Sequence, residues 1–247
     1  MRDFLQQAVI LAGGRGERLR PLTDSLPKPM APVAGKPFLD YLIYSLTAAG
    51  VKKILLLVGY KQEKIIEQYQ NFGNGRIKIE FSRGKEEDET LQRVLQAKPF
   101  LDENFLLLYG DNFWPIDLAG MKEFYLANNC VCTTTVFNNK RGTAEYGAEN
   151  NIQVAADRTV LRYDKQRKHP GLNGVDIGYF ILKSSVLEGE FGPNPSMERE
   201  LLPRLVERKE LKAFLTDEQY YYITSLETLK SFEQFAKAQQ LKTVGDL

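Results

Sequence analysis

Residues 8–18 have the sequence Ala8-Val9-Ile10-Leu11-Ala12-Gly13-Gly14-Arg15-Gly16-Glu17-Arg18, an apolar run followed directly by a glycine-rich segment. Its first five residues are apolar and predict a strand that is buried on both faces. The three glycines that follow within four residues permit unusual backbone angles and let a ligand approach the chain closely. Successive N–H groups in such a loop form a cradle for anions. The stretch therefore predicts a buried strand that ends in an anion-binding loop.

The first half of the chain repeats this alternation of apolar runs and amphipathic segments. The patterns predict strands at residues 8–12, 54–58, 77–81 and 105–109, and helices at residues 38–49, 62–69 and 90–97. Continuous apolar strands that alternate with helices indicate a parallel sheet covered on both faces. Because ligands of such sheets bind beyond the carboxyl ends of the strands, the loops at residues 13–37 and 110–115 are the candidate binding loops.

The second half of the sequence has a different pattern, with more predicted strands joined by polar loops. The patterns predict strands at residues 131–137, 152–155, 160–163 and 175–182, and helices at residues 118–126, 197–206 and 225–238. No linker, repeat or low-complexity tract divides the chain. We therefore expect a single domain over residues 1–247, with a nucleotide-type half up to about residue 118 and a mixed half from about residue 119.

Composition excludes several classes of protein. The chain has 247 residues, 43% of them hydrophobic, and a net charge of +1, so it has no global basic field to hold nucleic acid or an anionic membrane. Two cysteines, Cys130 and Cys132, make no disulfide scaffold. The apolar runs are far shorter than the roughly 20 residues that cross a membrane, and the N-terminus lacks the features of a signal peptide. We expect a soluble, cytoplasmic protein.

The glycine loop also carries cations, namely Arg15, Arg18, Arg20 and Lys28. Forked guanidinium groups suit phosphate oxygens, which they bind in pairs. Neither a P-loop nor a dinucleotide fingerprint fits, because no Gly-Lys-Ser/Thr follows and prolines interrupt the chain where a helix would have to begin. The prolines at positions 21, 27, 29 and 32 instead predict a stiff, extended segment that holds Lys28 in place.

At this point the sequence resembles a known family. Residues 11–23, followed by Pro27-Lys28-Pro29, are similar to the signature of the sugar-1-phosphate nucleotidyltransferases, Gly-x-Gly-x-Arg-Leu-x-Pro-Leu-Thr and then Pro-Lys-Pro. Residues 35–41 and Gly110-Asp111-Asn112 continue the resemblance at the right separations. Within the family, residues 28–32 and 36–39 look most like the heptose-1-phosphate and mannose-1-phosphate guanylyltransferase branch. The resemblance thins after about Asp111.

The resemblance implies a Rossmann-like mixed, mainly parallel sheet between helices (an α/β fold of the GT-A-like nucleotidyltransferase type). It implies transfer of a nucleoside monophosphate from a nucleoside triphosphate, with GTP favoured, to a sugar 1-phosphate of heptose or mannose type. Catalytic roles then fall to Arg18 on the leaving phosphates, Lys28 on the α-phosphate and Asp111 as the ligand of Mg²⁺. The implied nucleotide-binding residues are Leu11, Ala12, Gly13, Gly14, Arg15, Gly16 and Thr90.

In the second half, three short matches imply contacts to the sugar phosphate. Tyr146-Gly147 resembles the family's Tyr-Gly, and Tyr163-Asp164-Lys165 resembles its Phe-x-Glu-Lys with Asp164 in place of Glu. Asp176 begins a segment that resembles Asn-Ala-Gly-Ile-Tyr. By the resemblance, Asp164 and Asp176 contact sugar hydroxyls and Lys165 contacts the phosphate.

Two departures from the family keep other hypotheses open. Residues 86–93, which begin with four acidic residues, lack the glycines of the family's Leu-Gly-Thr-Gly-Gly-Ala turn, and Tyr222 stands where the family has its second metal-binding Asp. One alternative is a catalytically weakened homologue that binds a nucleotide or nucleotide sugar and regulates a partner. Another is cytidylyl transfer to a non-sugar phosphate. The base, the sugar and the assembly into homo-oligomers stay open at this stage.

Overall fold

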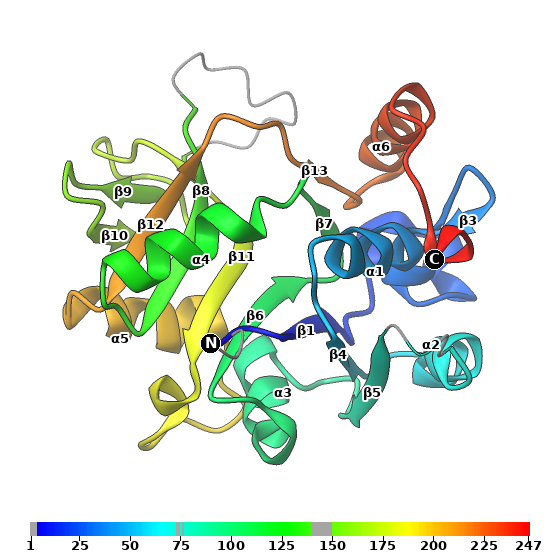
Figure 1. Cartoon of the computed structure of the whole chain (residues 1–247), viewed down its shortest axis with the longest axis horizontal. Coiled ribbons are helices and arrows are strands. Elements are labelled where there is room, and N and C mark those ends of the chain that lie inside the picture. Colours follow the sequence, from blue (N-terminus) through cyan, green and yellow to red (C-terminus); the bar gives the residue numbers. More distant parts are fainter. Residues whose placement is uncertain (1–3, 73–74, 76, 140–149) are drawn as a thin grey trace.

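The computed structural model describes residues 4–72, 75, 77–139 and 150–247. A seven-stranded sheet forms its centre, with the strand order β12-β8-β11-β6-β1-β4-β5 (Figure 1). The strands are β1 (Gln7–Ala12), β4 (Lys53–Val58), β5 (Lys78–Arg83), β6 (Asn104–Tyr109), β8 (Cys132–Phe137), β11 (Val175–Lys183) and β12 (Leu211–Thr216). Only β11 runs antiparallel to its neighbours, while the β12–β8, β6–β1, β1–β4 and β4–β5 pairs are parallel. The expectation of a mixed, mainly parallel sheet is therefore confirmed.

Helices cover both faces of this sheet. The α-helices are α1 (Phe38–Ala48), α2 (Gln62–Tyr69), α3 (Thr90–Gln96), α4 (Leu118–Ala127), α5 (Leu202–Glu207) and α6 (Leu226–Ala238), and a π-helical turn, η6 (Met197–Leu201), leads into α5. Side chains of β1 alternate between two buried clusters, because successive residues of a strand point to opposite faces. One cluster packs under α1, α2, α4 and α6, and the other under α3, η6 and α5.

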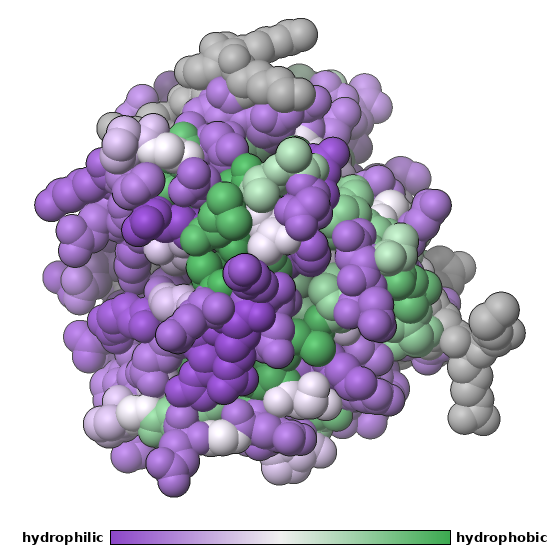
Figure 2. Space-filling model, turned by 90° about the vertical axis from the view of Figure 1, so that its left-hand side faces the viewer, coloured by the Kyte–Doolittle hydropathy of each residue, from purple (hydrophilic) through white to green (hydrophobic). Residues whose placement is uncertain are grey.

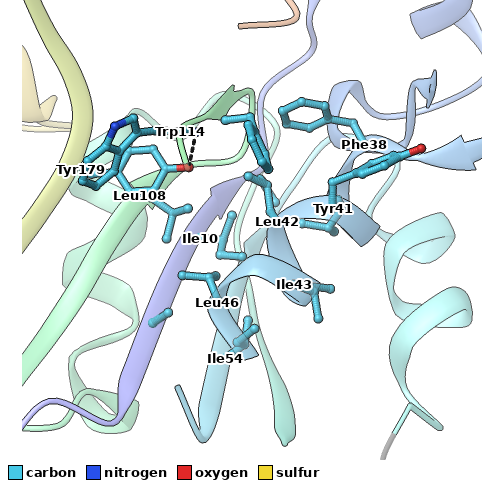
Figure 3. Close-up of a cluster of buried hydrophobic side chains, with 14 of the residues drawn as sticks. Ile10, Phe38, Tyr41, Leu42, Ile43, Leu46, Ile54, Leu108, Trp114 and Tyr179 are labelled. Atoms are coloured by element: carbon cyan, nitrogen blue, oxygen red, sulfur yellow. Dashed lines mark hydrogen bonds between the residues drawn. The ribbon is translucent and has the colours of Figure 1, made fainter. Parts of the chain in front are cut away.

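Figure 3 shows part of the first cluster, where Ile10 and Leu108 of the sheet face Leu42 and Leu46 of α1. Trp114 is buried there and packs edge-on against Tyr179, with 5.7 Å between the ring centroids. The Tyr179 hydroxyl accepts a hydrogen bond from the Trp114 backbone N–H at 3.2 Å (Figure 3). This packing fixes the chain just after Asp111.

Three short strand pairs accompany the main sheet. They are β2 (Pro32–Val33) with β3 (Lys36–Pro37), β7 (Asn112–Phe113) with β13 (Tyr221–Tyr222), and β9 (Ile152–Val154) with β10 (Val160–Tyr163). The sequence patterns located the helices and the long strands to within a few residues. They missed β12, in which the apolar run is only three residues long, Ala213-Phe214-Leu215, and lies between Lys212 and Thr216.

The proline-rich segment is folded differently from the expectation. The sequence predicts a stiff, extended segment, whereas the structure shows three 3-10 turns, η1 (Glu17–Leu19), η2 (Leu22–Asp24) and η3 (Lys28–Met30). Proline fixes a φ near −65°, which suits the first position of such a turn as well as an extended chain. Further 3-10 turns are η4 (Lys98–Phe100), η5 (Ser184–Leu187) and η7 (Val244–Asp246).

The face at the left of Figure 1, over β9 and β10, is mostly hydrophilic, with hydrophobic residues showing in its centre (Figure 2). Leu161 of β10 is 51% exposed. Among the described residues, none of the helices has the length and apolar character needed to cross a membrane.

Candidate active site

A cavity of about 230 Å³ opens at the carboxyl ends of β1 and β6. It is lined by Leu11, Ala12, Gly13, Gly14, Lys28, Pro29, Asp88, Glu89, Thr90, Arg93, Tyr109, Gly110 and Asp111. The structure thus brings together Lys28, Asp111, Thr90 and the four residues 11–14 at the end of β1 and the start of the glycine loop, all of which the sequence singled out. Arg93, Tyr109 and the acidic pair Asp88 and Glu89 join them without having been anticipated as site residues.

Backbone geometry at two glycines shapes this cavity. Gly16 has a φ of +65°, and a Cβ there would lie 2.7 Å from the Cβ of Lys28, so a side chain would push Lys28 away. At Gly110 a Cβ would lie 2.8 Å from the carbonyl oxygen of Leu11. The Gly110 N–H instead donates to that oxygen at 3.0 Å. Glycine is therefore required where the loop meets Lys28 and where the end of β6 meets β1.

Lys28 and Asp111 form an ion pair across the cavity wall. The Lys28 side chain is 12% exposed and that of Asp111 is 30% exposed, so the carboxylate remains accessible from the cavity. The two residues are 83 positions apart in the chain and meet because η3 and the end of β6 border the same cavity. This pair lies at the carboxyl ends of parallel strands, where ligands bind in such folds. The ammonium can bind a phosphate oxygen, and the carboxylate can bind a divalent cation that accompanies the phosphate.

Two of the four acidic residues at 86–89 form ion pairs, and a third accepts a backbone hydrogen bond. Arg15 Nε lies 2.5 Å from Glu86, and Arg199 Nη2 lies 2.8 Å from Glu89. The Asp88 carboxylate accepts the Lys85 N–H at 2.6 Å. Negative charge beside the cavity is therefore compensated locally, which lowers its cost to a bound anion. Arg15 contacts the acidic loop rather than the cavity in this structure.

A hydrogen-bond network ties the start of α3 to the end of β6. The Thr90 hydroxyl accepts the Met197 N–H at 2.8 Å and donates to Glu198 at 3.3 Å. Glu198 also accepts the hydroxyl of Tyr109 at 2.6 Å. Burial is the main cause of the strongly raised pKa of Tyr109, which keeps this hydroxyl protonated. Nothing local in the sequence marks Glu198, because its role depends on the π-helical turn η6 lying over α3.

Asp176 does not line the cavity and is held by hydrogen bonds of its own. Its carboxylate accepts the Thr134 hydroxyl at 2.7 Å and the Gly178 N–H at 3.0 Å. Burial raises the pKa of Asp176 to about 6, assisted by the nearby charge of Glu198 and opposed by these hydrogen bonds and one to Tyr163. Asp176 therefore changes its charge close to neutral pH.

This raised pKa predicts how stability depends on pH. The native state holds the Asp176 proton more tightly than the unfolded chain, so its contribution to stability falls as the pH rises from about 4 to above 6. Asp176→Asn abolishes that fall. The variant is expected to gain about 2 kcal/mol relative to wild type between pH 4.5 and pH 7.5, at about 1.4 kcal/mol per pKa unit. Urea unfolding at a series of pH values measures the difference, and parallel pH curves for the two proteins would contradict it.

Asp164 serves as the control. Desolvation acts to raise the pKa of the Asp164 carboxyl, but hydrogen bonds from backbone N–H groups of residues 166–169 outweigh it, and the pKa is lowered. Asp164→Asn is expected to lose stability above about pH 4, the opposite direction to Asp176→Asn.

Asp164 and Lys165, which the family resemblance assigns to the sugar phosphate, do not line the cavity. The Asp164 carboxylate accepts backbone N–H groups of Gln166, Lys168 and His169 at 2.8 to 3.0 Å, so it caps its own loop. Lys165 is exposed. Tyr146 and Gly147 lie outside the described residues.

Tyr222 lies beside Asp111. It pairs with Asn112 across the β7–β13 ladder, and the next residue, Ile223, donates its N–H to the Asp111 carbonyl at 2.9 Å. Burial raises the pKa of the Tyr222 hydroxyl, although the charges of Arg167 and Arg18 act in the opposite direction. Arg18 itself is exposed on η1 and does not line the cavity. In the part of the chain that the structure describes, no three His, Cys, Asp or Glu side chains gather as a metal site.

Comparisons with known proteins agree with this geometry. The chain is 36% identical over 182 residues to the bifunctional protein GlmU of Methanocaldococcus jannaschii, covering 73% of this chain and 41% of that protein. It therefore spans about two-fifths of the length of such relatives. It is 29% identical over 213 residues to the D-glycero-alpha-D-manno-heptose 1-phosphate guanylyltransferase of Aneurinibacillus thermoaerophilus, covering 85% and 90% of the two chains.

Among solved structures, HddC from Yersinia pseudotuberculosis complexed with GMP-PN superposes with a TM-score of 0.76 at 26% identity. The match covers 93% of this chain and 99% of that one. The model of the nucleotidyl transferase family matches residues 7–225, which include the glycine loop, Lys28, Asp111 and Tyr222. The chain belongs to the nucleotidyl transferase family.

Proposed function

We propose that this protein transfers a nucleoside monophosphate from a nucleoside triphosphate, with GTP favoured, to a sugar 1-phosphate of heptose or mannose type. The products are a nucleoside diphosphate sugar and pyrophosphate. The observation that carries the proposal is the Lys28–Asp111 ion pair at the wall of a cavity lined by the glycine loop. The similarity to a heptose 1-phosphate guanylyltransferase over most of both chains supports the choice of base and sugar.

The chemistry follows from charge and position. A sugar phosphate oxygen attacks the α-phosphorus, a new P–O bond forms, and the bond to the β-phosphate breaks in line with it. Negative charge builds on the α-phosphate oxygens, where Lys28 is placed to neutralise it. Arg18, by the family resemblance, remains the predicted contact of the leaving pyrophosphate. Gly13 and Gly14 line the cavity, and their backbone N–H groups are the predicted contacts of the nucleotide.

The residues present suit Mg²⁺. This ion is usually held by one or two carboxylates together with substrate phosphates, and Asp111 offers an accessible carboxylate beside the phosphate cavity. A bound Mg²⁺ supplies Lewis-acid neutralisation of phosphate charge. In this chain Asp111 would hold it, and Lys28 would then be released from the carboxylate to contact the α-phosphate.

A pyrophosphate-release assay tests the proposal. It combines GTP, UTP, dTTP, CTP or ATP with mannose, heptose or glucose 1-phosphates in the presence of Mg²⁺. Release of pyrophosphate that requires both substrates is expected, and it should be fastest with GTP. Tight binding of a nucleotide or nucleotide sugar without turnover would instead favour a regulatory homologue, the alternative that the position of Tyr222 beside Asp111 suggests.

Tyr222→Asp distinguishes these alternatives directly. If Tyr222 occupies the place of a second metal-binding carboxylate, the new carboxylate beside Asp111 is expected to lower the half-saturating concentration of Mg²⁺ by about 10-fold, as a second anionic ligand strengthens a hard-cation site. Activity measured across a Mg²⁺ titration gives the result. Tyr222→Phe, which removes only the hydroxyl, is the matched control. A Mg²⁺ dependence that the Asp variant leaves unmoved would show that Tyr222 is not at the metal site.

A further inference from the structure

Three glycines stand in a row at the carboxyl ends of β1, β4 and β5. Ala12 pairs with Val58, which pairs with Arg83, so the residues that follow each strand also align. Those next residues are Gly13, Gly59 and Gly84. A Cβ on them would lie 2.2, 2.3 and 3.1 Å, respectively, from Nη1 of Arg93. Side chains at the first two positions would therefore displace the Arg93 guanidinium group.

Arg93 reaches this row from α3 and is only 5% exposed. Its guanidinium donates to the carbonyl oxygens of Val58 and Gly13 at 3.1 Å each, and to that of Glu86 at 3.2 Å. All three acceptors are neutral, so these hydrogen bonds orient the group but do not cancel its charge. Burial lowers the pKa of Arg93, and the acidic residues 87–89 oppose that effect. An arginine remains charged even so.

The oriented cation lies where a ligand can reach it. Arg93 lines the same cavity as the backbone of Gly13 and Gly14, next to Asp88. The Asp88 carboxylate is fixed through Oδ2, which accepts the Lys85 N–H at 2.6 Å and the Gln96 side-chain amide at 3.1 Å. Among the described residues, none donates a hydrogen bond to its other oxygen, Oδ1. The cavity thus presents a guanidinium and a carboxylate near each other, since Arg93 Nη1 and Asp88 Oδ2 both lie within 3.1 Å of where a Cβ on Gly84 would be.

We infer that Arg93 and Asp88 select the base of the bound nucleotide and that this base is guanine. This inference rests on the proposed function. Guanine carries an acceptor, O6, next to two donors, N1–H and the 2-amino group, which match a guanidinium and a carboxylate. Adenine and cytosine direct an amino group at the cation. Uracil and thymine lack the second donor, so the carboxylate is left with fewer partners.

Base analogues test each contact in the wild-type protein. Inosine triphosphate lacks the 2-amino group, and 2-aminopurine riboside triphosphate lacks both O6 and the hydrogen on N1. Each is expected to bind and react at least about 10-fold less well than GTP, because at least one hydrogen-bonding group of the protein is left without its partner. Preference for UTP, dTTP, CTP or ATP over GTP would overturn the inference while leaving nucleotidyl transfer intact.

Asp88→Asn provides a reversal of specificity. An amide donates where the carboxylate accepts, so the variant is expected to lose about 10- to 100-fold in kcat/KM for GTP and to gain for xanthosine triphosphate, whose O2 is an acceptor. Because Asp88 is only half-buried, this variant is expected to fold. Equal changes with both nucleotides would overturn the role of Asp88.

Arg93→Gln separates base selection from a purely structural role. If Arg93 contacts O6, the loss of kcat/KM is expected to be at least about 10-fold with GTP and to disappear with the 2-aminopurine analogue, which has no O6. A role limited to holding β1 and β4 together would lower activity with both nucleotides alike, and that outcome would contradict the inference. Arg83→Gln, an exposed arginine at the end of β5, is the matched control and should leave the ratio unchanged.

Equilibrium binding of the same triphosphates supplies a second readout. If the protein turned over no triphosphate, the proposed function would be refuted. The relative affinities of the protein for GTP, inosine triphosphate and UTP would still show whether it selects guanine. Preferential binding of GTP supports the inference, and equal binding of all three nucleotides overturns it.

Discussion

Replacing Lys28 with alanine is expected to lower kcat by about 100-fold or more. The Lys28 ammonium contacts Asp111 at the wall of the cavity and is placed to neutralise charge that develops on the α-phosphate. Removing one group that stabilises such charge typically costs 100- to 1000-fold in rate. The loss should be mainly in kcat, because the charge is greatest in the transition state. Steady-state pyrophosphate release at saturating substrates measures the effect.

Two controls separate charge from packing. Lys28→Met keeps an aliphatic stem, which packs against Gly16, and so should reproduce the loss without disturbing the loop. Lys53, at the amino end of β4, provides a matched control because it also pairs with an aspartate: its Nζ lies 2.9 Å from Oδ1 of Asp102. Lys53→Met should leave kcat unchanged. Wild-type turnover in both Lys28 variants would remove Lys28 from the chemistry.

The sequence anticipated the parts of this site that rest on local patterns. An apolar run followed by Gly13-Gly14 predicted both β1 and the binding loop, because a buried strand and a glycine turn each leave a signature over a few residues. The order of strands and helices followed from the same alternation. Lys28 and Asp111 needed the family resemblance, since a lone Lys or Asp has no pattern of its own.

Residues whose roles depend on distant segments could not be predicted in this way. Arg93 lies in α3 between buried Leu91 and Val94. Its charge is tolerated there because the glycines after β1, β4 and β5 leave room for the guanidinium group, which donates to backbone carbonyls of Val58 and Gly13. A charged residue inside an apolar helix face was the one available signal. Asp164 is a further example: the family resemblance implies a sugar contact, which stays a prediction, while the structure adds that the carboxylate caps its own loop, a role the sequence did not indicate. The local sequence does not show which of several nearby groups will donate a hydrogen bond to a given carboxylate.

Asp111→Asn is expected to abolish Mg²⁺-dependent turnover, a loss of about 1000-fold or more. The amide has the shape of the carboxylate but no charge, so it neither pairs with Lys28 nor offers the hard anionic oxygen that Mg²⁺ prefers. Packing around residue 111 should survive, because its backbone carbonyl still accepts the Ile223 N–H at 2.9 Å and Trp114 stays buried nearby. The fall in activity should therefore occur without a comparable fall in unfolding free energy.

Turnover of the variant across a Mg²⁺ titration, together with its urea unfolding curve, checks this expectation. Asp102→Asn, which breaks the Lys53 ion pair at the other end of the sheet, is the control for loss of a partly buried carboxylate. Because Lys28 and Asp111 are in contact, their effects should not add, and the double variant Lys28→Met with Asp111→Asn should be little slower than the worse single variant. Additive losses would mean that the two groups act independently, and an unaltered response to Mg²⁺ in Asp111→Asn would place the metal-binding carboxylate elsewhere.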